Sequence, residues 1–137
     1  MKIDVLQNPD LELIEFLSDK LTEFNWQRWE VSERLPLAVQ ATDDDGNVLA
    51  GASGRTFGDW LLLDRLWVSD ELRGQHIGSQ LLEQMELAAK QRGCTKCLLD
   101  TLNFQAKPFY EKHGYTVQWV QEGYPRDGCK YFMTKDL

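Results

Sequence analysis

Residues 66–82 constrain the fold more than any other segment of the chain. They read Leu-Trp-Val-Ser-Asp-Glu-Leu-Arg-Gly-Gln-His-Ile-Gly-Ser-Gln-Leu-Leu, an apolar strand, a glycine-bearing turn and the start of an amphipathic helix. Backbone N–H groups at a helix start lack intrahelical partners, and the helix dipole adds partial positive charge there, so this turn predicts a phosphate site. Gly74 and Gly78 permit close approach of the phosphate. The spacing matches neither a Walker loop nor a dinucleotide-binding loop.

Hydrophobic periodicity and turn residues divide the rest of the chain into helices and strands. The pair Asn8-Pro9 is typical of a helix start, and apolar residues then recur at helical spacing. The expected helices cover residues 9–24, 79–92 and 105–113. The expected strands cover residues 37–42, 48–55, 60–68, 97–101, 115–121 and 130–134.

The order of these elements predicts an α/β (α+β) fold with one mixed central sheet flanked by helices. Residues 37–68 form an antiparallel meander, and helix 79–92 makes a β-α-β crossover that places strand 97–101 parallel to strand 60–68. A C-terminal hairpin completes the sheet. With 137 residues, 42% of them hydrophobic and 11% aromatic, the chain is expected to form a single domain, residues 1–137, around one core.

The aromatic segment 24–29, Phe-Asn-Trp-Gln-Arg-Trp, follows the first helix and has two interpretations. It packs in the core at the helix end, or it forms a lip over a substrate cleft. Packing is favoured, because exposed Trp is usually avoided without a functional need.

The three cysteines give no convincing metal site. Cys94 and Cys97 have the spacing of half a zinc site, but Cys129, His76 and His113 lack the paired spacing that would complete it. No metal is expected, and the thiols fit a reducing compartment. The start of the chain lacks the apolar run of a signal peptide and no segment is long enough to span a membrane, so a cytoplasmic protein is expected.

The charge of the chain argues against polyanionic partners. The formal net charge is −7 and no dense Lys/Arg stripe is present, so binding to nucleic acid or to a membrane surface is not expected. A negative field raises the local concentration of cationic amines, although acidity is also a common means of solubility.

A second motif follows the turn at the expected distance. Residues 100–115 read Asp-Thr-Leu-Asn-Phe-Gln-Ala-Lys-Pro-Phe-Tyr-Glu-Lys-His-Gly-Tyr. Together with the turn at 73–78, Arg-Gly-Gln-His-Ile-Gly, this segment resembles the GNAT superfamily of acyl-CoA-dependent N-acyltransferases. In that family the turn is Arg/Gln-x-x-Gly-x-Gly/Ala, and an Asn after a strand precedes Ala, Phe-Tyr, Gly and an aromatic residue. One position departs from the family pattern, because His76 stands where a glycine is usual.

The resemblance implies a site for acetyl-CoA as the acyl donor. In the family the pantetheine arm lies between two splayed parallel strands and hydrogen-bonds to the first of them, while the diphosphate rests on the turn. The residues so implied are Leu66, Trp67, Val68, Arg73, Gly74, Gln75, His76, Ile77, Gly78, Ser79, Asn103, Lys107 and Tyr110. At His76 the histidine has to adopt positive φ at some cost, and its ring either turns away from the phosphates or donates to them.

Acyl transfer to an amine needs three further groups. Backbone N–H groups near Trp67 and Val68 can stabilise the carbonyl oxygen, and Tyr110, placed as the family's general acid, can protonate the leaving sulfur. Tyr110 could instead merely pack. Asp64 interrupts an apolar strand and is the candidate base that accepts the amine proton, or it pairs with Arg55 or Arg65 across the sheet.

Two functions follow from these motifs. The first is an N-acetyltransferase that moves an acetyl group from acetyl-CoA to a primary amine of a small molecule or peptide, by direct attack in a ternary complex. The alternative is a non-catalytic acyl-CoA sensor or interaction module, which the departure at His76 keeps open. A homodimer is a further expectation.

Overall fold

The computed structural model describes residues 1–31 and 33–137, which divide into two compact units, one up to position 32 and the other Glu33–Leu137. The first unit contains helix α1, Leu11–Trp26. Its cap is Asp10, whose carboxylate accepts a hydrogen bond from the Leu13 N–H at 3.0 Å, so the prediction of a start at Asn8-Pro9 was two residues early. None of the residues of α1 is buried, and both interpretations of the aromatic segment at its end stay predictions.

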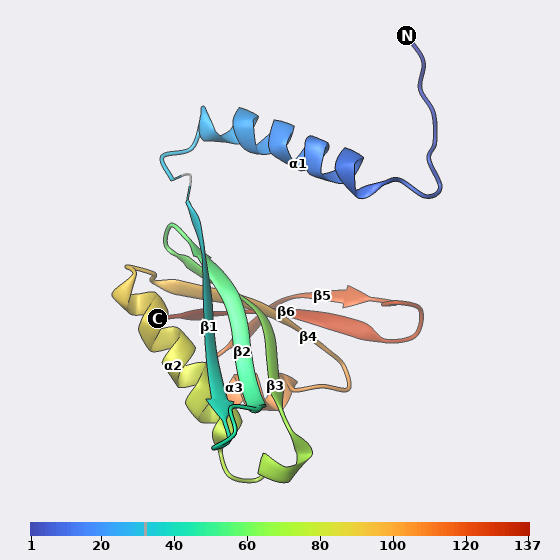
Figure 1. Ribbon diagram of the computed structural model, residues 1–137. Coiled ribbons are helices and arrows are strands. Elements are labelled where there is room, and N and C mark those ends of the chain that lie inside the picture. Colours follow the sequence, from blue (N-terminus) through green and yellow to red (C-terminus); the bar gives the residue numbers. More distant parts are fainter. Residues whose placement is uncertain (32) are drawn as a thin grey trace. The chain divides into compact units, whose positions relative to one another are not determined.

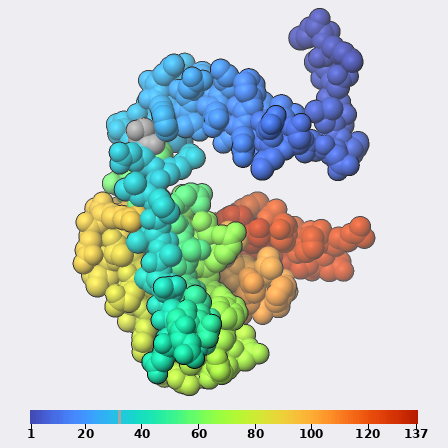
Figure 2. Space-filling view, in the orientation of Figure 1, coloured from blue at the N-terminus to red at the C-terminus, as the bar shows by residue number. Residues whose placement is uncertain are grey.

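The second unit is built on one six-stranded mixed sheet, which confirms the predicted fold class (Figure 1). Its strands are β1 (Arg34–Thr42), β2 (Val48–Phe57), β3 (Trp60–Val68), β4 (Lys96–Leu102), β5 (Thr116–Glu122) and β6 (Cys129–Asp136). They lie in the order β1-β2-β3-β4-β6-β5, so the second strand of the C-terminal hairpin, β6, pairs with β4. The edge strand β1 is the cyan segment on the side of this unit that Figure 2 turns toward the viewer.

Three helical elements complete the unit. A 3₁₀ turn, η1 (Asp70–Leu72), follows β3, and helix α2 (Ile77–Gln91) leads to β4. Helix α3 (Lys107–Lys112) follows β4 and has six residues, shorter than the predicted 105–113. Its start is set by Pro108, which has no N–H to leave unpaired. The helix ends just before Gly114, which has a φ of 90°.

One hydrophobic core joins α2 and α3 to the sheet. The apolar side of α2 carries Leu82 and Met85, which have no exposed surface, against Leu61 of β3 and Met133 of β6, which also have none. Burial of each such side chain contributes about 1.5–3 kcal/mol. Within the core, Glu86 accepts hydrogen bonds from the Tyr115 hydroxyl at 2.7 Å and the Lys135 ammonium at 2.8 Å, so its buried charge is compensated.

Strands β3 and β4 pair over only three residues before they separate (Figure 1). The parallel pairs join Trp60–Leu62 to residues 96–98, and no pairs follow. Just beyond, the register of β2 with β3 shifts, because Gly54 pairs with Leu63 while Ser53 pairs with Arg65. A side chain at Gly54 would clash with the carbonyl oxygen of Leu62, so glycine is required at this bulge.

Candidate active site

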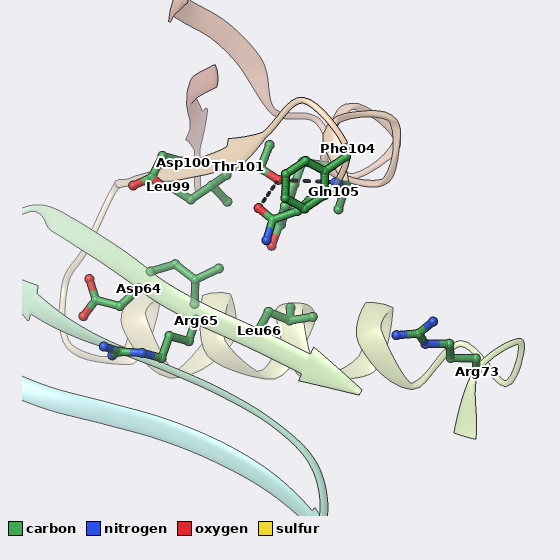
Figure 3. A pocket seen from close by; sticks show the side chains of 12 residues that line it. Asp64, Arg65, Leu66, Arg73, Leu99, Asp100, Thr101, Phe104 and Gln105 are labelled. Atoms are coloured by element: carbon green, nitrogen blue, oxygen red, sulfur yellow. Dashed lines mark hydrogen bonds between the residues drawn. The ribbon is translucent and has the colours of Figure 1, made fainter. Parts of the chain in front are cut away.

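The gap between β3 and β4 is a cleft of about 590 Å³. Figure 3 shows Asp64, Arg65 and Leu66 on β3 across the gap from Asp100 and Thr101 on β4, with Arg73 at the opposite end of the gap from Asp64. The Arg65 side chain extends away from β4 and also borders a hollow over β1 and β2. The remaining lining residues are Leu63, Leu99, Phe104, Gln105, Ala106 and Tyr110. The divergence of the two strands therefore brings residues from β3, β4 and α3 around one opening.

The second half of β3 offers unpaired backbone groups to this cleft. The Ser69 N–H donates to the Leu49 carbonyl at 2.9 Å, and opposed residues of antiparallel strands alternate between bonded and non-bonded pairs. Trp67 is consequently the next residue whose N–H faces β2, whereas the N–H groups of Leu66 and Val68 face the gap. Such groups need partners, and an extended amide chain can supply them.

The predicted phosphate turn surrounds a separate hollow of about 270 Å³ at the start of α2. It is lined by Val68, Leu72, Arg73, Gly74, His76, Ile77, Gly78, Ser79 and Phe109, so most of the predicted cofactor residues lie together. Within the turn from Arg73 to Ser79, Gln75 is the exception, because its amide reaches back to the Glu71 carbonyl at 3.5 Å. Arg73 is shared with the larger cleft, and its guanidinium pairs with Asp70 at 3.2 Å.

His76 adopts the left-handed conformation that its place in the turn predicts. Its φ is 61° and ψ is 23°, and it is the residue before the first residue of α2. Among the described residues it is the one non-glycine with positive φ, whereas Gly74, with φ of 80°, reaches that region without strain. The turn therefore keeps a glycine-type backbone with a histidine in it.

A hydrogen bond ties the turn to the end of α3. The Ser79 hydroxyl and Nε2 of His113 lie 2.9 Å apart, in a half-buried position. Phe109 packs against the His113 ring, with centroids 4.8 Å apart, and a Cβ at position 78 would lie 3.5 Å from the Phe109 ring. Neither the hydrogen bond nor His113 was anticipated from the sequence, because the two residues are 34 positions apart.

Tyr110 lies at the wall of the cleft and is 7% exposed. Its ring meets Phe109 and Tyr115 edge to face, with centroids 5.1 and 5.7 Å away. Burial raises the pKa of the Tyr110 phenol to about 12, with smaller contributions from Cys97 and Asp100. The phenol is therefore protonated at neutral pH and can donate.

Asp64 pairs with Arg55, which was one of its predicted alternatives. Both carboxylate oxygens accept from one guanidinium nitrogen, at 3.0 and 3.1 Å. Asp100, which sequence reasoning did not single out, lines the same cleft, and its side chain has no hydrogen bond or ion pair with the described residues. The signal was present, since Asp100 interrupts an apolar strand as Asp64 does.

The other two predicted cofactor residues are engaged elsewhere in the fold. The Asn103 side-chain oxygen accepts from the Cys129 N–H at 3.2 Å, which fastens the β4–α3 loop to β6. Lys107 lies 3.8 Å from Glu111 and over the Tyr131 ring at 5.0 Å. At the rim of the cleft, the Gln105 side chain accepts from the Leu102 N–H at 2.8 Å and shapes the same loop.

Two further features are absent from the described residues. No group of three His, Cys, Asp or Glu side chains comes together as a metal site would require. No helix in that part of the chain has the length and apolar character needed to cross a bilayer.

Comparison with known proteins identifies the family. Residues 38–117 match the acetyltransferase (GNAT) domain model, a span that includes the cleft, the turn and Tyr110. The chain belongs to the GNAT family of acetyltransferases. This GNAT acetyltransferase is 35% identical to an acetyltransferase of Agrobacterium fabrum over 107 residues, 78% of each chain. It is 33% identical to the blasticidin-S acetyltransferase of Streptomyces morookaense over 115 residues, 81% of this chain and 85% of that one.

A solved structure agrees with this assignment. The crystal structure of an acetyltransferase from Bacillus cereus ATCC 14579 is 30% identical and superposes with a TM-score of 0.87, over 98% of both chains. The fold and the resemblance predicted for this GNAT chain are thus confirmed.

Proposed function

We propose that this GNAT acetyltransferase transfers an acetyl group from acetyl-CoA to a primary amine of a small molecule or peptide, within a ternary complex. The observation that carries the proposal is the cleft itself: the unpaired N–H groups of Leu66 and Val68 lead from a turn suited to phosphate to Tyr110 at the wall of the cleft. The acetyltransferase names of the relatives support the chemistry.

The residues present fit coenzyme A as the acetyl carrier. The turn at the start of α2 offers orphan N–H groups and the helix dipole to a diphosphate, and the free edge of β3 suits the amides of a pantetheine arm. Bound there, acetyl-CoA would supply the acetyl group as an activated thioester. Roles for Asn103 and Lys107 toward the cofactor remain predictions.

Three chain groups would serve the transfer. The amine nitrogen attacks the thioester carbonyl carbon, and the N–H of Leu66 or Val68 stabilises the negative oxygen. The Trp67 N–H, which was expected near this oxygen, is replaced as donor by these two groups because it faces β2. As the carbon–sulfur bond breaks, Tyr110 gives its proton to the sulfur. The proton lost by the amine goes to a carboxylate of the cleft. Asp100 suits this step better than Asp64, because Arg55 already occupies both oxygens of Asp64.

An assay with a thiol-trapping reagent tests the proposal. The chain is incubated with acetyl-CoA and a panel of amines that includes amino acids, polyamines, aminoglycosides and peptides. Release of thiol that depends on one of these amines is the expected result. Binding of acetyl-CoA with no thiol release from any amine would contradict it and favour the non-catalytic acyl-CoA sensor.

Three further expectations also belong to the proposal rather than to the findings. They are a cationic acceptor, a cytoplasmic location and a homodimer. The blasticidin-S acetyltransferase among the relatives supports an antibiotic-like amine as one member of the test panel.

A further inference from the structure

The end of the cleft away from Arg73, where the amine would bind, is here called the acceptor end. Its side chains carry charges of both signs, although the net charge of the chain is −7. Three charged side chains line this end, Asp64, Arg65 and Asp100 (Figure 3). Asp64 is compensated by Arg55, with an ion pair of 3.0 Å between side chains that are about two-fifths exposed. The other two charged side chains, Arg65 and Asp100, have no ion pair with the described residues.

Arg65 is the cation of that remaining pair. Its side chain makes no hydrogen bond or ion pair with the described residues, although Asp64 is its neighbour in the chain. The bulge explains its direction. Because β3 has one residue more than β2 at this point, Asp64 and Arg65 are successive residues that both lie away from the buried face, on which Leu63 and Leu66 continue the core.

Asp100 is the carboxylate of that pair and faces β3 from the other side of the gap (Figure 3). It pairs in register with Phe132 of β6, whose ring lies tilted against Trp119 with centroids 5.3 Å apart. Phe104, 76% exposed, stands at the rim of the same cleft. An acceptor that meets Asp100 therefore also meets apolar aromatic surface.

We infer that the acceptor is an amino acid or amino-acid derivative with a free carboxylate close to its amine. Its ammonium group pairs with Asp100, which then takes the proton released before attack, and its carboxylate pairs with Arg65, whose guanidinium matches the geometry of a carboxylate. A polyamine would have to place a second cation beside Arg65, which is unfavourable. This inference rests on the proposed acetyl transfer and narrows its acceptor class.

Three compounds that differ only at the carboxylate test the inference: phenylalanine, phenylalaninamide and phenethylamine. We expect kcat/KM for phenylalanine to exceed that for the other two by at least about tenfold, through a lower KM. The amide has the less basic amine, so a preference for the acid does not arise from easier deprotonation. Thiol release is measured for each compound at saturating acetyl-CoA.

Variants of the two arginines locate the effect. Arg65→Gln is expected to reduce kcat/KM for phenylalanine about tenfold and to change that for the amide less than twofold. Arg34→Gln is the matched control, because Arg34 lies over Phe57 on the far edge of the sheet, and it should change neither. Arg65→Lys should restore part of the preference.

Several outcomes would overturn the inference. Equal kcat/KM for the three compounds, an equal loss for all of them in Arg65→Gln, or turnover of spermidine in preference to phenylalanine would each do so while leaving acetyl transfer intact. Absence of thiol release with every amine would instead overturn the proposed function, and this inference with it.

Discussion

The two ends of the cleft are built from different parts of the chain. The donor end consists of backbone, namely the free N–H groups of Leu66 and Val68 and the turn from Arg73 to Ser79. The acceptor end consists of side chains, chiefly Arg65 and Asp100, from strands that do not pair at this point. A backbone site follows from one contiguous motif, whereas a side-chain site depends on where separate strands diverge. The acceptor end is therefore the part that can change between relatives while the donor end keeps its form.

The largest effect that separates chemistry from binding is expected at Tyr110. Tyr110→Phe keeps the ring and its contacts and removes the proton donor, so kcat should fall by about 10²-fold while coenzyme A affinity and the melting temperature stay unchanged. The three quantities are measured on one preparation.

Tyr115→Phe is the matched control for Tyr110→Phe. Tyr115 is 3% exposed, and its hydroxyl donates to Glu86 in the core rather than to the cleft. This variant should lower the melting temperature and leave kcat nearly intact. A loss of kcat in the Tyr115 variant as large as in the Tyr110 variant would mean that disturbed packing, not proton donation, explains both.

The next largest effect is expected at the donor end, in the affinity for coenzyme A. It is tested by changing the ligand rather than the protein. Backbone N–H groups that bind a charged oxygen are each worth about 1.5–3 kcal/mol, so pantetheine, which lacks the diphosphate, should bind at least about tenfold more weakly than coenzyme A. Isothermal titration calorimetry measures both affinities. Equal affinities would show that the turn is not a phosphate site, and the contrast between the two ends would then fail.

A smaller effect is expected from the contact of Ser79 with His113. With Nε2 protonated, the imidazole donates to the Ser79 hydroxyl and leaves the hydroxyl proton free for a phosphate oxygen. His113→Ala should then weaken coenzyme A binding about threefold. It should have no further effect in a Ser79→Ala background.

A double-mutant cycle on coenzyme A affinity makes this test quantitative. The same loss in both backgrounds would assign the effect to the packing of Phe109 on the His113 ring instead. His113→Gln, which retains an N–H donor, should preserve more of the affinity than His113→Ala.

The smallest effect concerns the histidine in the turn. His76→Gly removes the cost of φ at 61° and should raise the free energy of unfolding by about 1 kcal/mol, with activity kept. Thermal unfolding and kcat/KM are the measurements. His76→Ala keeps the strained backbone without the ring and serves as the control. A large loss of activity in both variants would show that the imidazole itself takes part at the donor end.

Local patterns predicted most of the fold. The meander, the crossover and the hairpin all follow from alternation and turn residues, and the structure has them with boundaries shifted by a few residues. The position of β6 between β4 and β5 was not predicted, because pairing of distant strands leaves no local trace. For the same reason, the choice of Arg55 rather than Arg65 as partner of Asp64 stayed open until the register was known.

The candidate site divides in the same way. The turn and Tyr110 lie in contiguous motifs and were identified from them, whereas Asp100, Phe104 and His113 acquire their places only when β4 and α3 are set against β3 and α2. Gln75 shows the limit of a motif, because its position within the turn does not fix the direction of its side chain.

The bulge opposite Gly54 has a consequence for how such a chain can vary. Asp64 has no partner in the β2 register, so removing or exchanging that residue leaves the in-out alternation of the flanking segments unchanged. Leu63 on one side and Leu66 on the other would keep their places in the core. The charge along this wall of the cleft can thus change by mutation at position 64 while the folded framework is kept, provided that position 54 stays glycine.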